Sequence, residues 1–329
     1  MKYNLNVAVI GSGYMGKVHL NALNDTVSNL ILCTNDTKTG EELKSKYNIK
    51  LYTDYNEMFE KEKLDFVSVC LPTHIHYNAV MSALKHNINV LCEKPFSSTV
   101  QEAEEMVTLA KEKGLLLMVA HCLRFYKHYE YLKRCISDER FGKLLYLNLF
   151  RHGNAPDWSV GGWLNNIELS GGVVRDLHVH DTDMALHLLG MPESVYTTGC
   201  ATLSNTIYKY NDKSLSVTGS GSWRNTPDMA DFVGFDVIFE NGSIRFVDGK
   251  LSVHNSKGKV ENPLENENFE FYFADITGDE KLAEIQYFCH CLTNNLQTDL
   301  CLPEDSLKTM KISNAESESL KTKKEIFIL

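Results

Sequence analysis

Apolar runs that alternate with helical segments fill the chain as far as Ala120. Residues 7–10, Val-Ala-Val-Ile, have the pattern of a strand buried on both faces of a parallel sheet. We expect further strands at residues 30–34, 66–71, 88–92 and 115–120, and helices at residues 17–23, 38–47, 54–61, 77–86 and 99–114. Strands that alternate with helices predict a doubly wound, parallel α/β sheet.

After Ala120 the pattern changes to short strands joined by turns. Strands are expected at residues 144–150, 196–198, 214–223, 233–240, 243–247 and 251–254, helices at 125–136, 184–189, 279–294 and 305–319, and a polar surface excursion at 255–268. The turn Glu240-Asn241-Gly242 indicates a hairpin. We therefore expect two domains: residues 1–122 with the parallel sheet, and residues 123–329, an α+β domain with a large open, mostly antiparallel sheet.

A glycine-rich turn directly follows the first strand. It is Gly11-Ser12-Gly13-Tyr14-Met15-Gly16, and a helical segment begins behind it. Gly11 permits the turn, Gly13 lets a pyrophosphate approach the backbone, and Gly16 lets the helix pack closely on the strand. Because a helix N-terminus presents N–H groups and the positive end of its dipole, the turn predicts a dinucleotide site.

The second strand is followed by the polar sequence Thr34-Asn35-Asp36. A carboxylate at this point accepts hydrogen bonds from the adenosine ribose and repels a 2′-phosphate. Asp36 and Asn35 are the candidates, and together they favour NAD while leaving NADP open. The alternative is that Asp36 only caps the next helix.

Two later strand ends also carry polar residues. One is Leu71-Pro72-Thr73, with His76 beyond it, and the other is Glu93-Lys94-Pro95. Ligands bind beyond the carboxyl ends of such strands, so these residues are expected to converge on the cofactor site. Lys94 could also be an ordinary turn lysine, but the flanking Glu93 and Pro95 favour a functional role, because Pro95 biases Lys94 toward an extended conformation.

The second half contains one stretch rich in chemical groups, residues 170–183. Asp176 and His180 are four residues apart, so both can face one side of a helix. His180 has the pKa range of a general acid or base. If the segment were a strand, His178 and His180 would share a face and could hold a metal. A further alternative is that His178 and His187 are structural polar residues.

Composition excludes several classes of protein. The net charge of −10 argues against a nucleic-acid partner. No apolar run approaches the length of a membrane span, and the N-terminus does not resemble a signal peptide. The nine cysteines form no C-x-x-C, and Cys289-His290-Cys291 is interpreted as structural. We therefore expect a cytoplasmic enzyme without a metal.

The combined motifs resemble the glucose–fructose oxidoreductase/inositol dehydrogenase (Gfo/Idh/MocA) family over essentially the whole chain. The matching residues are Gly11–Gly16 with His19, Leu71-Pro72-Thr73 with His76, Glu93-Lys94-Pro95, Arg124-Phe125, and Gly171-Gly172 leading to Asp176, His180 and Asp183. The resemblance implies a Rossmann domain, then an α/β domain whose open sheet carries the contacts of a homodimer or homotetramer. It also implies a pyridine-nucleotide-dependent oxidoreductase that acts on sugars or cyclic polyols.

The resemblance assigns roles to individual residues. Lys94 corresponds to the catalytic lysine, and Asp176 and His180 to the acid–base pair. The expected cofactor-binding residues are Gly11, Ser12, Gly13, Tyr14, Met15, Gly16, Asn35, Asp36, Leu71, Pro72, Thr73, His76, Glu93 and Lys94. The expected substrate-binding residues are Arg124, Tyr126, Trp163 and His178, with Arg151 and Trp158 as further candidates for the pocket wall. His178 departs from the family, which commonly has glycine there.

Two other functions stay open at this point. The chain could be a nucleotide-sensing regulator that has lost catalysis, although the joint presence of Lys94, Asp176 and His180 argues against it. It could also be a metal-dependent hydrolase that uses His178 and His180.

Overall fold

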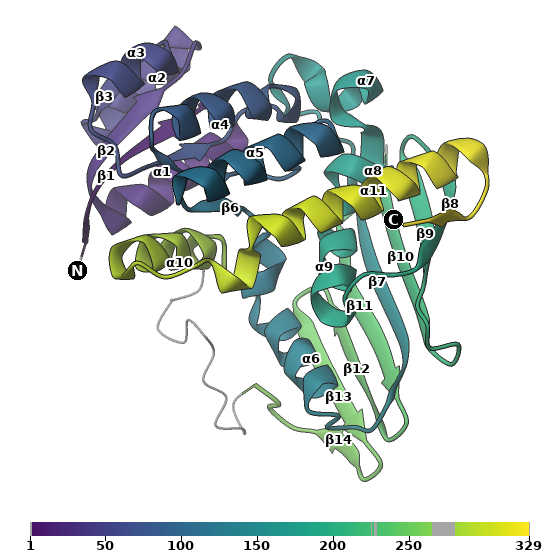
Figure 1. Cartoon of the computed structure of the whole chain (residues 1–329). Coiled ribbons are helices and arrows are strands. Elements are labelled where there is room, and N and C mark those ends of the chain that lie inside the picture. The colour runs from purple at the N-terminus through teal and green to yellow at the C-terminus, as the bar shows by residue number, and fades with distance from the viewer. Residues whose placement is uncertain (1, 225, 227–228, 265–279, 329) are drawn as a thin grey trace. The chain divides into compact units, whose positions relative to one another are not determined.

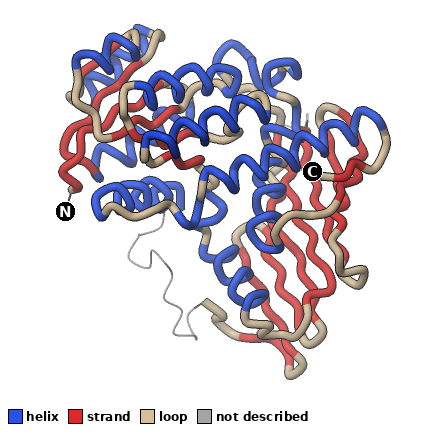
Figure 2. Tube along the Cα trace, in the orientation of Figure 1, coloured by secondary structure: helices blue, strands red, loops and turns tan. Residues whose placement is uncertain are grey.

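The structure is a computed structural model that describes residues 2–224, 226, 229–264 and 280–328. Its contacts divide the chain into two units (Figures 1 and 2). The first unit comprises Met1–Cys122, Trp158–Trp163 and Asp279–Met310, and the second comprises Leu123–Asp157, Leu164–Gly278 and Lys311–Leu329. Residues 158–163 and the described part of 279–310, which we expected in the second domain, therefore group with the first unit.

The first unit is built on a parallel six-stranded sheet with the strand order β3-β2-β1-β4-β5-β6. Its elements are β1 (Tyr3–Ile10), α1 (Tyr14–Thr26), β2 (Val27–Cys33), α2 (Thr37–Tyr47), β3 (Lys50–Tyr52), α3 (Tyr55–Lys61), β4 (Phe66–Val69), η1 (Thr73–Ile75), α4 (His76–Lys85), β5 (Asn89–Cys92), α5 (Val100–Lys113), β6 (Leu117–Val119), α10 (Glu280–Asn294) and η4 (Asp299–Cys301). Helix α11 (Pro303–Thr322) starts in this unit and ends in the second. The prediction of a doubly wound parallel sheet is confirmed.

Both faces of this sheet are covered by helices, because its strands are apolar on both sides. On β4, Val67 and Val69 pack into a core with α3, α4 and α5. The alternate residue Phe66 meets Phe288 of α10 edge-on, with ring centroids 5.0 Å apart, and Ser68 faces α1. A strand buried on both faces needs such a continuous apolar run, which is why the sequence pattern located these strands.

The second unit contains a nine-stranded sheet with the order β14-β13-β12-β11-β7-β10-β9-β8-β15. Its elements are η2 (Cys122–Phe125), α6 (Lys127–Ser137), β7 (Leu144–Asn154), α7 (Ile167–Ser170), α8 (Gly172–Asp176), α9 (Val179–Leu189), β8 (Ser194–Cys200), β9 (Leu203–Lys209), β10 (Ser216–Arg224), β11 (Phe232–Phe239), β12 (Gly242–Val247), β13 (Lys250–Asn255), β14 (Gly258–Val260) and β15 (Ile326–Phe327), and the segment η3 (Val160–Asn165) precedes α7. In the described part of this sheet, β7 and β10 are the only strands that pair in parallel, so the expected mostly antiparallel sheet is confirmed.

Strand β9 is absent from the sequence prediction, and its side chains explain why. The inward residues are the polar Ser204, Thr206 and Tyr208, whereas Leu203 and Ile207 point outward and are 45% and 44% exposed. This inverts the usual apolar-inside pattern. The short strands β14 and β15 were also missed, and β14 lies inside the expected polar excursion. The rest of that excursion, from residue 265 onward, falls outside the described residues.

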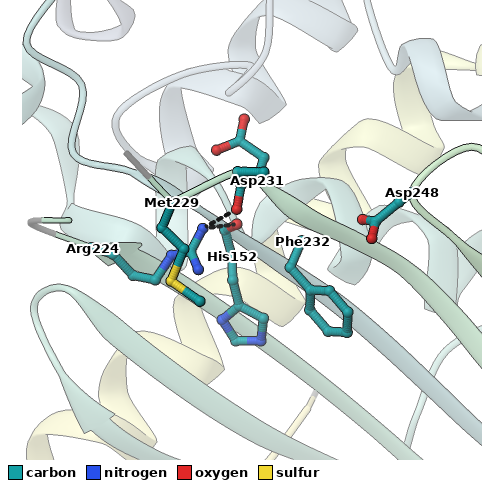
Figure 3. Close-up of a pocket in the computed structure, with 7 residues that line it drawn as sticks. His152, Arg224, Met229, Asp231, Phe232 and Asp248 are labelled. Carbon is teal, nitrogen blue, oxygen red and sulfur yellow. Dashed lines mark hydrogen bonds between the residues drawn. The ribbon is translucent and has the colours of Figure 1, made fainter. Parts of the chain in front are cut away.

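The two faces of this sheet differ in their covering. One face packs against helices: Tyr129 of α6 contacts Phe235 of β11, and Tyr208 of β9 contacts α11. The other, which we call the open face, carries the exposed residues Leu203, Ile207, Phe232 and Ile238. A pocket on the open face is lined by His152, Arg224, Met229, Ala230, Asp231, Phe232 and Asp248 (Figure 3). Two of its polar side chains bond within the protein: the His152 ring contacts Ser220 and Ser222, and Arg224 donates to the carbonyl oxygens of His152 and Ala230.

The described residues contain no helix that is long and apolar enough to cross a membrane.

Candidate active site

The glycine turn of the first unit has the geometry of a dinucleotide loop. Gly11 has φ +111°, and a Cβ there would lie 2.4 Å from the carbonyl oxygen of Cys70. A Cβ on Gly16 would lie 2.1 Å from the carbonyl oxygen of Gly11, so strand and helix touch at this point. Helix α1 begins after Gly13 with no side-chain cap and no acidic residue in its first turn. The N-terminus is therefore suited to a phosphate anion.

The polar residues after β2 lie at the expected place, but Asp36 has a second task. Its carboxylate accepts a hydrogen bond from the Thr39 amide at 3.1 Å and caps α2. The hydrogen bonds from the Thr39 side chain and from the Thr39 amide lower the pKa of Asp36. Ser12 Oγ and Thr34 Oγ1 lie 2.8 Å apart and tie the glycine turn to the end of β2. Asn35 and Asp36 are both exposed, which leaves the capping carboxylate accessible to a ribose hydroxyl.

His76, expected to contact the cofactor, is fully buried and holds two loops together. Its ring nitrogens lie 2.7 Å from the carbonyl oxygen of Leu71 and 2.9 Å from that of Pro95. These carbonyls belong to the segments after β4 and β5. Burial lowers the pKa of His76. Its imidazole therefore links the two strand ends from inside the protein, while Leu71 and Pro72 are half-buried and Thr73 is buried at the start of η1.

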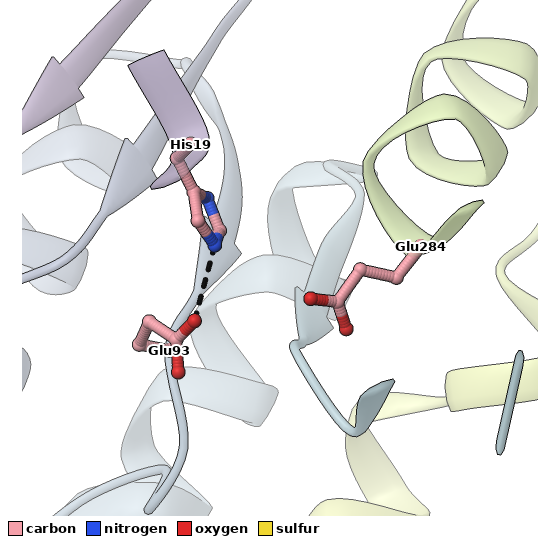
Figure 4. A group of neighbouring side chains, drawn as sticks. All are labelled: His19, Glu93 and Glu284. Atoms are coloured by element: carbon pink, nitrogen blue, oxygen red, sulfur yellow. Dashed lines mark hydrogen bonds and ion pairs between the residues drawn. The ribbon is translucent and has the colours of Figure 1, made fainter. Parts of the chain in front are cut away.

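Lys94 follows Glu93 in a segment anchored by buried charges (Figure 4). Glu93 Oε1 lies 3.0 Å from His19 Nε2, and Glu93 Oε2 accepts a 3.1 Å hydrogen bond from the Lys94 amide. His19 Nδ1 lies 2.6 Å from Ser68 Oγ. Burial lowers the pKa of His19, but its contacts with Cys70 and Glu93 outweigh burial and hold that pKa well above 6.5.

Glu93 itself is an anion. Burial raises the pKa of its carboxyl. The hydrogen bond from His19 and the positive charges of His19 and Lys94 lower this pKa by a larger amount, so the net shift is downward. The result is a buried ion pair of His19 and Glu93 directly behind the Lys94 backbone. The Lys94 side chain is half-buried.

A second carboxylate, that of Glu284 on α10, points toward this pair (Figure 4). Among the described residues, His19, Glu93 and Glu284 form the one group whose ligand atoms lie close enough to hold a metal, within 4.8 Å of one another. A hydrogen bond already joins His19 to Glu93, which accounts for their contact without an ion.

In the second unit, Asp176 and His180 lie at the junction of two helices. Asp176 is the last residue of α8 and His180 the second residue of α9, with Leu177 and His178 as a helical turn between them. Asp176 and His180 therefore lie on two helices rather than on one: α8 ends at Asp176, and α9 starts at Val179, earlier than the helix expected at 184–189. A strand is excluded here, so the shared strand face required for a His178/His180 metal pair does not exist. Both Asp176 and His180 are half-buried.

Two expected substrate-binding residues are engaged in the interior of the second unit. Arg124 forms a bidentate pair with Asp183, from Nε to Oδ2 at 2.9 Å and from Nη2 to Oδ1 at 2.7 Å, and each side chain is 1% exposed. Arg151 contacts the buried Asp181 at 3.3 Å. Tyr126 is half-buried at the start of α6. Removing one partner of such a buried pair leaves an uncompensated charge, so these contacts favour a structural role.

The two tryptophans expected in the pocket wall group with the first unit. Trp158 lies 5.4 Å from Tyr14 of the glycine turn, and Trp163 lies 6.0 Å from His74 of η1, both measured between ring centroids. Trp158 is 59% exposed. These contacts place both rings beside the segments expected to bind the cofactor, a relation that the sequence did not reveal.

Comparison with known families identifies the class of protein. Residues 5–121 match the model of an oxidoreductase family with an NAD-binding Rossmann fold, and residues 129–272 match the GFO/IDH/MocA C-terminal domain. The chain belongs to the Gfo/Idh/MocA oxidoreductases, and NAD(P) is the cofactor class of its first unit. The residues of the glycine turn fit this cofactor, because α1 is uncapped and Gly13 leaves the approach open.

The individual proteins that this chain resembles are named as different enzymes. The chain is 31% identical to the 2,7-anhydro-N-acetylneuraminate hydratase of Mediterraneibacter gnavus, over 58% of this chain and 51% of that protein, so the match spans about half of that relative. It is 23% identical to the myo-inositol 2-dehydrogenase of Thermotoga maritima, with 98% of each chain covered. A levoglucosan dehydrogenase solved with NADH and levoglucosan has a TM-score of 0.84 at 18% identity, with 99% of each chain covered.

Proposed function

We propose that this protein transfers a hydride between NAD(P) and a secondary alcohol or ketone of a sugar or cyclic polyol. The main support is the family membership together with the retained Lys94, Asp176 and His180. Two relatives named as dehydrogenases, of myo-inositol and of levoglucosan, support a polyhydroxylated ring as the substrate class. The regulator and hydrolase alternatives lack comparable support, because no relative reported above is named as either.

The proposal divides the chemistry between the cofactor and the chain. Nicotinamide, when bound, accepts or supplies the hydride. In the oxidation direction, His180 takes the proton of the substrate hydroxyl as general base. The Lys94 ammonium stabilises the negative charge that develops on the substrate oxygen, and Asp176 accepts a hydrogen bond from a neighbouring hydroxyl. Positioned proton transfer of this kind contributes about 10²–10⁴-fold to the rate.

The hydratase among the relatives suggests a second candidate reaction. A hydratase adds or removes water, which leaves substrate and product at the same oxidation level, so the nicotinamide would have to return to its starting state in each turnover. Such an activity would produce no net NADH. The two candidates therefore differ in a directly measurable quantity.

A turnover screen tests both candidates. The purified chain is incubated with NAD or NADP and a panel of inositols, aldoses, sugar acids and anhydro sugars, and NADH absorbance and product mass are recorded. A dehydrogenase gives stoichiometric NADH and a product lighter by two hydrogens, and the Asp36 carboxylate predicts a preference for NAD. A mass change of one water at catalytic NAD favours the hydratase, and no conversion of any compound contradicts the proposed chemistry.

The proposal includes a homodimer or homotetramer that forms through the open face of the second sheet. Four large apolar side chains are exposed there on β9 and β11, and an exposed apolar surface of this kind is typical of interfaces. We expect the double variant Ile207→Lys/Ile238→Lys to have a lower mass than the wild type in light scattering. Met191→Lys, at a residue that is 38% exposed after α9, is the control that keeps the wild-type mass. A monomeric wild type would contradict this part of the proposal.

A further inference from the structure

His178 is the residue of the second unit whose role the sequence left open. It lies in the turn between α8 and α9, two residues after Asp176 and two before His180, and it is fully buried. We propose that His178 is a positioning residue that anchors this turn to β9 and α11 and thereby fixes the orientation of Asp176 and His180. This inference rests on the proposed function, because it assigns those two residues to the reaction.

The anchor is a continuous hydrogen-bond network. His178 Nε2 lies 3.0 Å from the hydroxyl oxygen of Tyr208 on β9. The Tyr208 hydroxyl in turn donates to Glu316 Oε1 of α11 at 2.6 Å, so its oxygen is left to accept from His178. Thr182, one turn further along α9, donates to Glu316 Oε2 at 2.9 Å. One buried carboxylate therefore holds the turn, through Tyr208 and His178, and also holds α9, through Thr182.

The sheet beneath the turn is shaped for this imidazole. On β10, a Cβ added to Gly219 would lie 2.8 Å from His178 Cε1, and one added to Gly221 would lie 3.2 Å from His178 Cβ. Two glycines on the same face of one strand thus make room for the ring and its backbone. A strand residue with a side chain at position 219 would displace His178, so the glycines and the histidine form one complementary contact.

The surrounding charges favour the imidazolium. His178 Nε2 lies 3.4 Å from Glu316 Oε1, and His178 Nδ1 lies 3.7 Å from Asp181 Oδ2. Arg151 of β7 pairs with the same Asp181. Burial lowers the pKa of His178, but the two carboxylates outweigh burial and raise it to about 9. The cluster then holds two cations and two anions. The attraction between them offsets the free-energy cost of removing these charges from water.

These contacts also bear on the expected substrate-binding role of His178. The ring is 0% exposed and directs Nε2 to Tyr208, away from solvent. A residue that binds the substrate needs an accessible polar atom. The geometry therefore supports an indirect role, in which His178 acts through the backbone that it shares with Asp176 and His180.

Two variants and a matched control test the inference with the substrate found in the turnover screen. Tyr208→Phe removes one hydroxyl and keeps the ring volume, and His178→Gln removes the imidazole. Because a displacement of about 1 Å costs about 100-fold in rate, we expect kcat to fall at least about tenfold in both, with an unchanged KM for NAD. His187→Gln replaces a histidine of α9, the helix that follows the turn; His187 contacts Lys133 instead, and the variant should stay within about twofold of the wild type.

Each outcome decides the inference. If His178→Gln does not fold, Tyr208→Phe alone is used. A Tyr208→Phe enzyme with the wild-type kcat overturns the positioning role, even if its melting temperature is lower, because a purely structural network would affect stability alone. A wild type that converts no compound would instead contradict the proposed function, so the two failures are distinguishable.

A measurement without turnover checks the charge of the network. In protein labelled with ¹³C-histidine, the His178 resonance is the one absent from the His178→Gln spectrum. We expect it to remain in the imidazolium form at pH 8, since its pKa is about 9. A resonance that titrates near 6.5, the usual histidine pKa, would contradict the proposed ion cluster.

Discussion

Replacing Lys94 with alanine is expected to lower kcat by about 10²–10⁴-fold, the range typical of a positioned catalytic group, while the Kd for NAD stays near the wild-type value. The expected loss follows from the role proposed for the ammonium: the alkoxide that develops during oxidation would lose its positive partner. Cofactor affinity should survive because we propose that the pyrophosphate binds at the glycine turn, whose own close contacts involve Gly11, Gly16 and Cys70 rather than Lys94.

Steady-state kinetics and calorimetric titration with NAD separate the two quantities. Lys85→Ala is the matched control, because this lysine is exposed at the end of α4 in the same unit, and it should behave like the wild type. His180→Ala should reproduce the loss of kcat if it supplies the general base. Full turnover in both Lys94→Ala and His180→Ala would refute the assigned roles.

The sequence predicted Lys94 because three features coincide there: a strand end, a preceding glutamate and a following proline. It did not predict what holds the segment. Ser68 and Glu284 meet His19 and Glu93 only after β4 and α10 have packed on α1, and Glu284 lies far along the chain from the others. Such contacts leave no local periodicity, so patterning alone offers no way to find them.

The difference between local sequence patterns and contacts between distant segments also explains which strands the sequence predicted. Strands of the first unit are buried on both faces and therefore appear as apolar runs, which located five of the six. Strand β9 directs the polar residues Ser204, Thr206 and Tyr208 to its buried face, and one of them, Tyr208, belongs to the His178 network. The feature that hid the strand from the hydrophobic pattern is thus part of what we propose positions the site.

The Arg124–Asp183 pair shows that a sequence motif does not distinguish a ligand contact from a buried ion pair. Both residues belong to the family pattern, and a polar residue in such a pattern suggests contact with a ligand. In the structure their side chains are 1% exposed and bond to each other. A sequence motif records which residue types recur together, and a buried ion pair recurs as strictly as a binding site because losing either partner is strongly destabilising.

Alanine substitutions at Gly16 and Gly13 of the dinucleotide turn are expected to have different effects, the first mainly on stability and the second mainly on NAD affinity. At Gly16, a Cβ would lie 2.1 Å from the carbonyl oxygen of Gly11, a backbone atom at the point where the helix packs against the strand. Relief requires α1 to move away from β1. We expect Gly16→Ala to lower the free energy of unfolding by at least about 1–3 kcal/mol, the usual cost of overpacking, and to weaken NAD binding as a consequence.

Gly13 offers the contrasting case within the same turn. Its φ of −67° suits any L-residue, and a Cβ there has nothing within 4 Å. Gly13→Ala should therefore leave the free energy of unfolding within about 0.5 kcal/mol of the wild type. The space that the Cβ would enter is the space in which a pyrophosphate approaches the α1 amides, so the Kd for NAD should rise at least about tenfold, or about 1.4 kcal/mol.

Urea unfolding and calorimetric titration on both variants measure the two effects separately. Lost affinity with retained stability in Gly13→Ala would tie the open space at this glycine to the cofactor, because no atom of the described residues lies within 4 Å of the added Cβ. If Gly13→Ala bound NAD as tightly as the wild type, the pyrophosphate would have to lie elsewhere, and the proposed alignment of nicotinamide with Lys94 would lose its support. Equal destabilisation of both variants would instead show that the turn needs Gly13 for folding.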